Sequence, residues 1–247
     1  MGISARLLAG MWCVLLGFLA TAAVAQEKGA ARPGFTEEAL RGQKIILLRP
    51  SVWVGEQSTG GLREPNADWT ATARHLLDAE LARQLSGNDN QIVQEPTDLD
   101  PDTLKITTDH KALFKTVAAS VIQYQFFVGN RLPTRKNHPF EWTLGPGMRK
   151  LAETSGARYG LFINVDDQYG SVGRKMFQIL AAGLVGVSVQ SGAHIGYAGL
   201  IDLQSGDLVW LNADQQMGGD VRTADGMAKR VTQLLEDYPG SHPKVRP

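Results

Sequence analysis

Cysteine is almost missing from this sequence of 247 residues. The single cysteine, Cys13, lies in an apolar run close to the start of the chain, after Met11 and Trp12. A lipoprotein signal has small residues directly before its cysteine, so we do not expect lipidation here. If the first segment is removed, the remaining chain has no thiol. This excludes disulfides, cysteine nucleophiles and cysteine-based metal sites.

Metal-binding and nucleic-acid-binding patterns are missing as well. The five histidines show neither HxH nor i,i+4 spacing. Catalytic zinc requires three converging protein ligands and one open position, so we expect no metal and no cofactor. Lys plus Arg and Asp plus Glu each total 25, giving a net charge of zero. This balance gives no reason to expect a nucleic-acid partner.

The common catalytic and phosphate-binding motifs are also absent. The chain contains no GxSxG motif of the kind that presents a nucleophilic serine. The sequence YGSVGRK at 169–175 places two glycines and two cations after an apolar run, but its glycine spacing differs from that of a P-loop. Met176 also occupies the position of the hydroxyl that would bind Mg²⁺. We interpret this stretch as a glycine turn with solvated cations.

The first 25 residues have the pattern of a secretory signal peptide. Arg6 is followed by an apolar run from Leu7 to Ala20, and Ala23-Val24-Ala25 supplies the small residues that signal peptidase reads. The alternative is a membrane anchor, but the run is shorter than the roughly 20 residues of a spanning helix. We therefore predict a signal peptide at 1–25 and a periplasmic location. Beyond it we predict a flexible lead at 26–42, a single α/β domain at 43–238 and a loose tail at 239–247.

The pattern of apolar residues predicts both strands and helices in that domain. The predicted strands cover Gln43–Pro50, Gln91–Gln94, Tyr159–Val165 and a late hairpin, Tyr197–Leu203 with Leu208–Leu211. The predicted helices cover Ala67–Leu85, His110–Phe127, Met148–Ser155 and Ala224–Tyr238, and the predicted loops cover Ser51–Asn66 and Arg131–Pro146. This order favours an α/β (α+β) fold, with a mixed sheet, a late antiparallel hairpin and helices packed on the sheet.

The apolar run Met176–Val189 has helical spacing and several small residues. At about 14 residues it is too short to cross a bilayer as one helix. It fits a core helix, a surface for self-association or for a partner, or a membrane-associated hairpin. As interface candidates we select Leu180, Leu184 and Val187, followed by two tryptophans predicted in loops, Trp53 and Trp142.

Acidic residues near the predicted strand ends leave one catalytic alternative open. Asp166 and Asp167 follow the strand at 159–165, and paired carboxylates can perform acid–base chemistry when they converge. An exported hydrolase could use these aspartates. Aspartates in turns and caps are far more common, because their side chains bond their own backbone.

The sequence GLIDLQSGDLVWLN at Gly199–Asn212 resembles a pattern in exported Gram-negative envelope proteins of the curli-secretion-channel and TolB amino-terminal-domain type. Relatives of these proteins include small lipoproteins that activate cell-wall synthases or assist polysaccharide export. ARYGLFINVDD and KIILLRP fit the same layout, so the resemblance covers 43–238 in outline. It implies a non-enzymatic binding or assembly domain in the periplasm, whose partner is another envelope protein or a second copy of the chain. It assigns a role to no residue, and this chain lacks the lipoprotein cysteine motif of those relatives.

Overall fold

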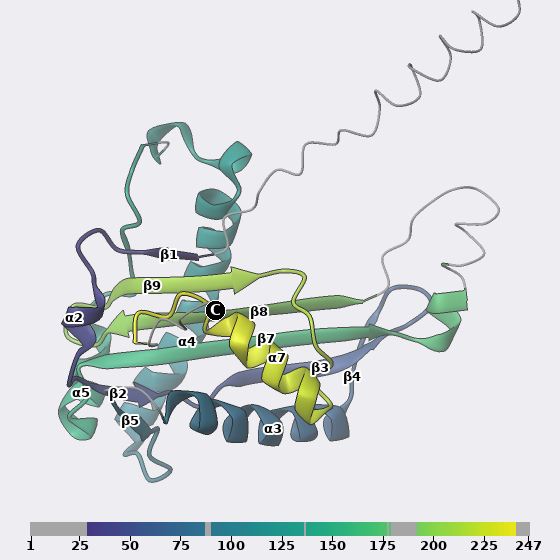
Figure 1. Cartoon of the computed structure of the whole chain (residues 1–247), viewed down its shortest axis with the longest axis horizontal. Coiled ribbons are helices and arrows are strands. Elements are labelled where there is room, and N and C mark those ends of the chain that lie inside the picture. Colours follow the sequence, from purple (N-terminus) through teal and green to yellow (C-terminus); the bar gives the residue numbers. More distant parts are fainter. Residues whose placement is uncertain (1–28, 87–89, 136, 177, 179–191, 241–247) are drawn as a thin grey trace, which may run out of the picture.

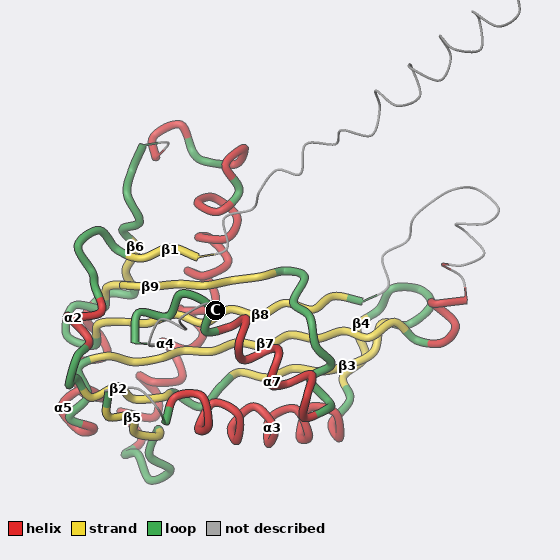
Figure 2. The backbone as a smooth tube through the Cα atoms, viewed as in Figure 1, coloured by secondary structure: helices red, strands yellow, loops and turns green. Residues whose placement is uncertain are grey.

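The computed structural model describes residues 29–86, 90–135, 137–176, 178 and 192–240 (Figures 1 and 2). Within these residues, nine strands form one mixed sheet: β1 (Gly29–Ala31), β2 (Lys44–Leu47), β3 (Ser51–Gln57), β4 (Arg63–Pro65), β5 (Gln91–Gln94), β6 (Trp142–Thr143), β7 (Tyr159–Gly170), β8 (Ala193–Asp202) and β9 (Asp207–Asp214). The α-helices are α2 (Glu37–Leu40), α3 (Ala67–Leu85), α4 (Pro101–Val121), α5 (Arg149–Ser155) and α7 (Ala224–Leu234), and the π-helical turn η1 (Ile122–Phe126) continues α4. Short 3₁₀ turns cover Val128–Asn130, Pro133–Arg135 and Pro146–Met148. The predicted α/β (α+β) class with a late antiparallel hairpin is confirmed.

Strand β7 is the centre of the sheet. One edge of β7 pairs antiparallel with β8. Beyond β8, the sheet continues with β9, which pairs with β8, and with β1, which pairs with β9. Its other edge is shared by two strands, because β2 pairs in parallel with the first part of β7 and β3 with the last part. Between β2 and β3 the chain leaves that edge at Arg49 and Pro50, two residues outside both strands.

Helices cover both faces of the sheet. Helices α3 and α7 lie on the face nearer the viewer in Figure 1, and α4 lies behind the sheet. Because neighbouring side chains of a strand point to opposite faces, β7 contributes side chains to the hydrophobic core on each face of the sheet. Ile163 and Val165 belong to the core under α3 and α7, whereas Phe162 packs with Phe114 of α4.

Local sequence explains where these helices begin and end. The Asn66 side chain accepts a hydrogen bond from the Trp69 N–H at 2.9 Å and caps α3. Asp100 caps α4, and Pro101 fits the first position of a helix, where no N–H is needed. Gly156 ends α5 with a φ of 65°, a conformation that glycine adopts without strain.

Several predicted elements differ from the structure. The loop predicted at Ser51–Asn66 is wrong, because this segment forms β3 and β4. The helix predicted from His110 begins at Pro101, and the strand predicted at Tyr159–Val165 continues to Gly170. Residues 29–31 and 37–40, in the segment predicted as a flexible lead, form β1 and α2. The predicted signal peptide lies outside the described residues, and so does most of the run 176–189.

Candidate functional site

Asp166 and Asp167, the predicted acidic pair, lie next to each other in β7 and point to opposite faces of the sheet. Asp166 lies opposite Trp53 of β3 and accepts two hydrogen bonds from the Arg63 guanidinium, at 2.8 and 2.9 Å. Asp167 is fully buried against α7 and binds Arg230. Each carboxylate therefore has its own cation, and the two do not converge on one substrate position.

Asp167 and Arg230 form an ion pair in which neither side chain has any exposed surface. Two guanidinium N–H groups donate to the two carboxylate oxygens at 2.6 and 3.0 Å. Arg230 also donates to the backbone carbonyls of Gly218 and Gly219. Nδ1 of His194 lies 3.0 Å from the same carboxylate. Because a buried charge is tolerated only when it is paired and hydrogen-bonded, these contacts hold α7 and residues 218–219 to the middle of β7.

A second carboxylate, Asp220, extends this buried network. The Tyr169 hydroxyl lies within hydrogen-bond distance of Asp220 (2.9 Å) and Asp167 (3.1 Å), and it accepts from the Val221 N–H. Arg222 binds Asp220 in a bidentate manner and lies over the Tyr169 ring, 3.7 Å from its centre. The hydrogen bonds from Arg222 lower the pKa of Asp220, and burial together with the nearby Asp167 charge raises the pKa of Tyr169. These groups satisfy one another, which indicates a structural clamp.

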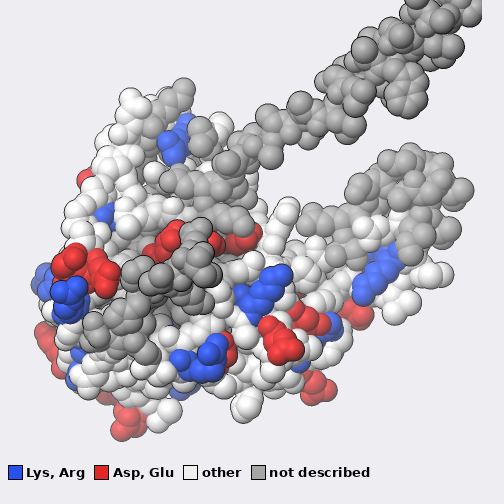
Figure 3. Space-filling model, viewed as in Figure 1, with Lys and Arg blue, Asp and Glu red and all other residues white. Residues whose placement is uncertain are grey.

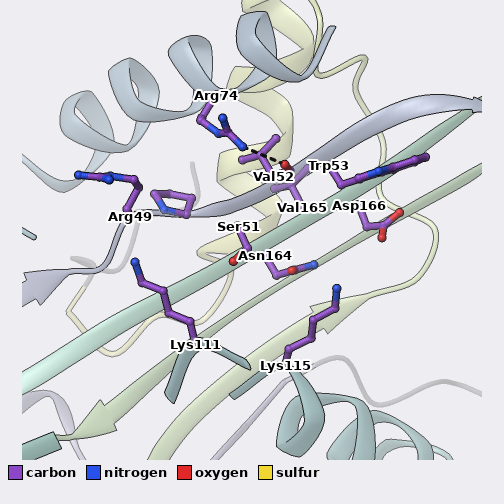
Figure 4. Close-up of a pocket in the computed structure, with 11 residues that line it drawn as sticks. Arg49, Ser51, Val52, Trp53, Arg74, Lys111, Lys115, Asn164, Val165 and Asp166 are labelled. Carbon is purple, nitrogen blue, oxygen red and sulfur yellow. Dashed lines mark hydrogen bonds between the residues drawn. The ribbon is translucent and has the colours of Figure 1, made fainter. Parts of the chain in front are cut away.

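A cavity of about 470 Å³ opens where the chain leaves the edge of β7 (Figure 4). It lies between the end of β2 and the start of β3. Arg74 reaches toward it from α3, and Lys111 and Lys115 reach toward it from α4 on the other side of the sheet. The remaining lining residues come from the strands and the connection between them: Arg49, Pro50, Ser51, Val52, Trp53, Asn164, Val165 and Asp166.

The surroundings of this cavity carry an excess of positive charge. The cations are Arg49, Arg63, Arg74, Lys111 and Lys115, and the carboxylates near them are Asp78, Glu95 and Asp166. Five cations against three carboxylates leave two positive charges uncompensated. The Glu95 carboxylate accepts hydrogen bonds from the Lys111 ammonium, at 2.5 Å, and from the Arg49 backbone N–H. Lys115 is exposed and makes no hydrogen bond or ion pair to any described residue.

The sequence-predicted interface residues fall in different parts of the molecule. Leu180, Leu184 and Val187 lie outside the described residues. Trp53 and Trp142 were predicted in loops, and this is wrong, since they lie in β3 and β6. The Trp53 ring lies across Gly55, with the Arg63 guanidinium 4.1 Å from its centre. Both tryptophans are partly buried, so neither is a freely projecting side chain.

Exposed apolar side chains gather at one end of the sheet. Leu62, between β3 and β4, is 71% exposed, and Val172 and Met176, which follow β7, are 77% and 60% exposed. The two segments lie side by side: a Cβ on Gly173 would overlap the Thr59 hydroxyl. We call the surface of Leu62, Val172 and Met176 the tip. In Figure 1 it lies at the right, beside the β3–β4 turn.

Sequence reasoning missed the cationic cavity. Lys111 and Lys115 are four residues apart and therefore share one face of α4, a signal that was available in the sequence. Their meeting with Arg74 depends on the pairing of β3 with β7, which local sequence does not show. Over the face seen in Figure 3, cations and carboxylates alternate and form no large area of one sign. No three metal-binding side chains converge among the residues whose placement is described.

No protein family profile matches the chain, and neither does any curated protein. Among solved structures, the PelC dodecamer from Paraburkholderia phytofirmans is similar, with 12% identity and a TM-score of 0.38, over 87% of this chain and 96% of that one. Lipoprotein GNA1162 from Neisseria meningitidis has 14% identity and a TM-score of 0.28, over 70% and 78% of the two chains. The LpoB C-terminal domain from Salmonella enterica has 18% identity and a TM-score of 0.24, over 75% and 88%. All three are envelope proteins, and no specific family is shown for this chain.

Proposed function

We propose that this chain is a non-enzymatic binding and assembly protein of the cell envelope, which works in the periplasm through protein–protein contacts. The tip is the observation that carries the proposal. Its three apolar side chains are each at least 60% exposed, and the two segments that carry them approach each other at Thr59 and Gly173. Fully covering a side chain of this kind contributes about 1.5–3 kcal/mol, so a partner that covers all three gains a substantial part of its binding free energy there.

The described residues on either side of 179–191 approach the end of β3. Ser171 donates a backbone hydrogen bond to Gln57, and Gly192 donates one to the Gln57 side chain. Ser171 and Gly192, which flank in sequence the predicted contacts Leu180, Leu184 and Val187, therefore both lie at the end of β3. Signal-peptide-like residues at 1–25 support the periplasmic location, and every helix in the described ranges is too short or too polar to cross a bilayer.

The hydrolase alternative gains little support from the geometry of Asp166 and Asp167. A pair of catalytic carboxylates must approach one substrate, whereas these side chains point to opposite faces and each is held by an arginine. Turnover by the purified protein that disappears with Asp166→Asn would favour the hydrolase. Membrane association through 176–189, the other alternative, predicts that the mature protein resists carbonate extraction.

The experiment is crosslinking in the periplasm, followed by size-exclusion chromatography with light scattering. We compare wild type with Leu62→Asp and Val172→Asp, both of which place a charge on the tip. The matched control is Leu104→Asp, which changes an apolar side chain that is 51% exposed in the first turn of α4, where an acidic residue is well tolerated. We expect the tip variants to lose crosslinked species that the control retains. The mass of those species separates self-association from a different envelope partner. A wild type that stays monomeric and uncrosslinked, like its variants, contradicts the proposal.

Two of the solved structures, including the PelC structure above, are named as dodecamers. That state is a property of those proteins. For this chain, the light-scattering mass of the wild type provides the corresponding measurement.

A further inference from the structure

We infer that the cavity between β2, β3, α3 and α4 is a binding site for a small oxyanion, a ligand that carries a phosphate or carboxylate group. This goes beyond the proposed assembly role, because the cavity and the tip are lined by different residues.

The shape of the site follows from the strand pairing. The Leu48 N–H still bonds to Leu161, and Ser51 pairs with Asn164. Between these points the chain bulges away from β7 at Arg49 and Pro50, and proline has no N–H with which to continue the ladder. The bulge opens a space that side chains from both helix layers reach. At about 470 Å³ it lies in the range of small-molecule sites.

The positive charges that line the cavity without a carboxylate partner favour an anionic ligand. Lys111 is held by Glu95, and Asp166 is held by Arg63. Lys115 makes neither a hydrogen bond nor an ion pair to any described residue, although it lines the cavity. Arg74 makes one long hydrogen bond, 3.4 Å, to the Val52 carbonyl, which leaves most of its donors available. An arginine fork and a lysine ammonium are the groups that proteins use for phosphate and carboxylate.

A buried polar side chain inside the cavity also points to a ligand. Asn164 is only 5% exposed and lines the space, yet its amide group makes no hydrogen bond to any described residue. The amide atoms are not among the buried unpartnered side-chain atoms of the described residues, so they open into the cavity, where they can bond to a ligand. An oxyanion held by Arg74 and Lys115 would accept from the Asn164 amide as well, and the Trp53 ring offers an apolar wall for the rest of the ligand.

The test is a titration of the mature protein with inorganic pyrophosphate, monitored by ¹⁵N NMR of the side-chain amides. We expect saturable shifts of the Asn164 side-chain signal. Because a charge-assisted hydrogen bond is lost, Lys115→Gln should weaken binding about tenfold or more, and Lys115→Gln with Arg74→Gln should weaken it further. The matched control is Lys105→Gln, which removes a lysine from the same helix whose partner is Asp109 and which does not line the cavity. This variant should bind like wild type.

A second experiment distinguishes an oxyanion on a lipid headgroup from a free oxyanion. Co-sedimentation with phosphatidylglycerol vesicles, compared with phosphatidylcholine vesicles, tests a lipid headgroup. Binding to phosphatidylglycerol that Lys115→Gln reduces assigns the site to headgroups, and binding to pyrophosphate alone assigns it to a free anion. The proposal is overturned if neither probe binds, or if Lys115→Gln and Lys105→Gln behave alike. Because Leu62→Asp leaves the cavity intact, it should bind pyrophosphate normally, so this test is independent of the assembly role.

Discussion

Replacing Arg230 by methionine should strongly destabilise the protein, because it leaves the Asp167 carboxylate buried without its cation. Both side chains are fully buried, and the guanidinium makes two hydrogen bonds to the carboxylate and two to backbone carbonyls. Removing one partner of such a pair costs about 3–5 kcal/mol. For a domain of this size each kcal/mol shifts Tm by about 2–4 °C, so Tm should fall by roughly 6–20 °C.

The measurement is urea unfolding followed by circular dichroism, with Tm as a second readout. A double variant, Asp167→Leu with Arg230→Met, removes both charges and should recover much of the lost free energy of unfolding. Lys105→Met breaks the exposed pair with Asp109 and should leave Tm within error of wild type. The reasoning is refuted if Arg230→Met loses less than about 1 kcal/mol, or if the double variant is no more stable than Arg230→Met.

Substitutions at three further positions test other parts of the structure. Asn66→Ala should cost about 0.5–2 kcal/mol in urea unfolding by removing the cap of α3, whereas Asn66→Ser should retain most of the stability. Gly55→Ala should cost about 1–3 kcal/mol, because the added methyl group overlaps the Glu64 carbonyl and the Trp53 ring, and an unchanged midpoint would contradict that packing. Asp220 has a pKa held below its ordinary value of 3.8 by the hydrogen bonds from Arg222, so its contribution is present above that value and is lost as pH falls below it. Asp220→Asn should therefore be less stable than wild type at pH 7, and urea midpoints should show the difference shrinking between pH 4 and pH 2; a difference that stays constant would exclude this origin.

Elements with a local signal could be predicted from the sequence. Helix α3 has the predicted bounds, because a capping asparagine precedes a regular apolar stripe. The β8–β9 hairpin follows from two apolar runs joined by a short turn with Gly206 at a φ of 79°. The start of α4 also has a local signal, Asp100 followed by Pro101, which lies before the apolar stripe that predicts a helix from His110.

Elements that depend on distant pairing could not be predicted. Strand β3 is surrounded by glycine, serine and proline, and it is a strand because Ser51 through Gln57 pair with the far half of β7, more than 100 residues later. The candidate sites also depend on contacts between residues that are far apart in the sequence. Asp166 and Asp167 could be selected as acidic residues, but their partners, Arg63 and Arg230, come from other elements. The cavity joins four parts of the chain that no local pattern connects: residues 49–53, Arg74, Lys111 with Lys115, and residues 164–166.

The ion pair between Asp167 and Arg230 also bears on when the protein folds. The two residues are 63 positions apart, and Arg230 lies in the last helix. In the export route that we propose, the chain emerges from its amino terminus and presents Asp167 before Arg230. Until then, closing α3 over this face would bury the Asp167 carboxylate with His194 and Tyr169 as partners but without the arginine that neutralises it. For a chain exported as proposed, we therefore expect this face of the sheet to close only after the carboxy-terminal helix has emerged.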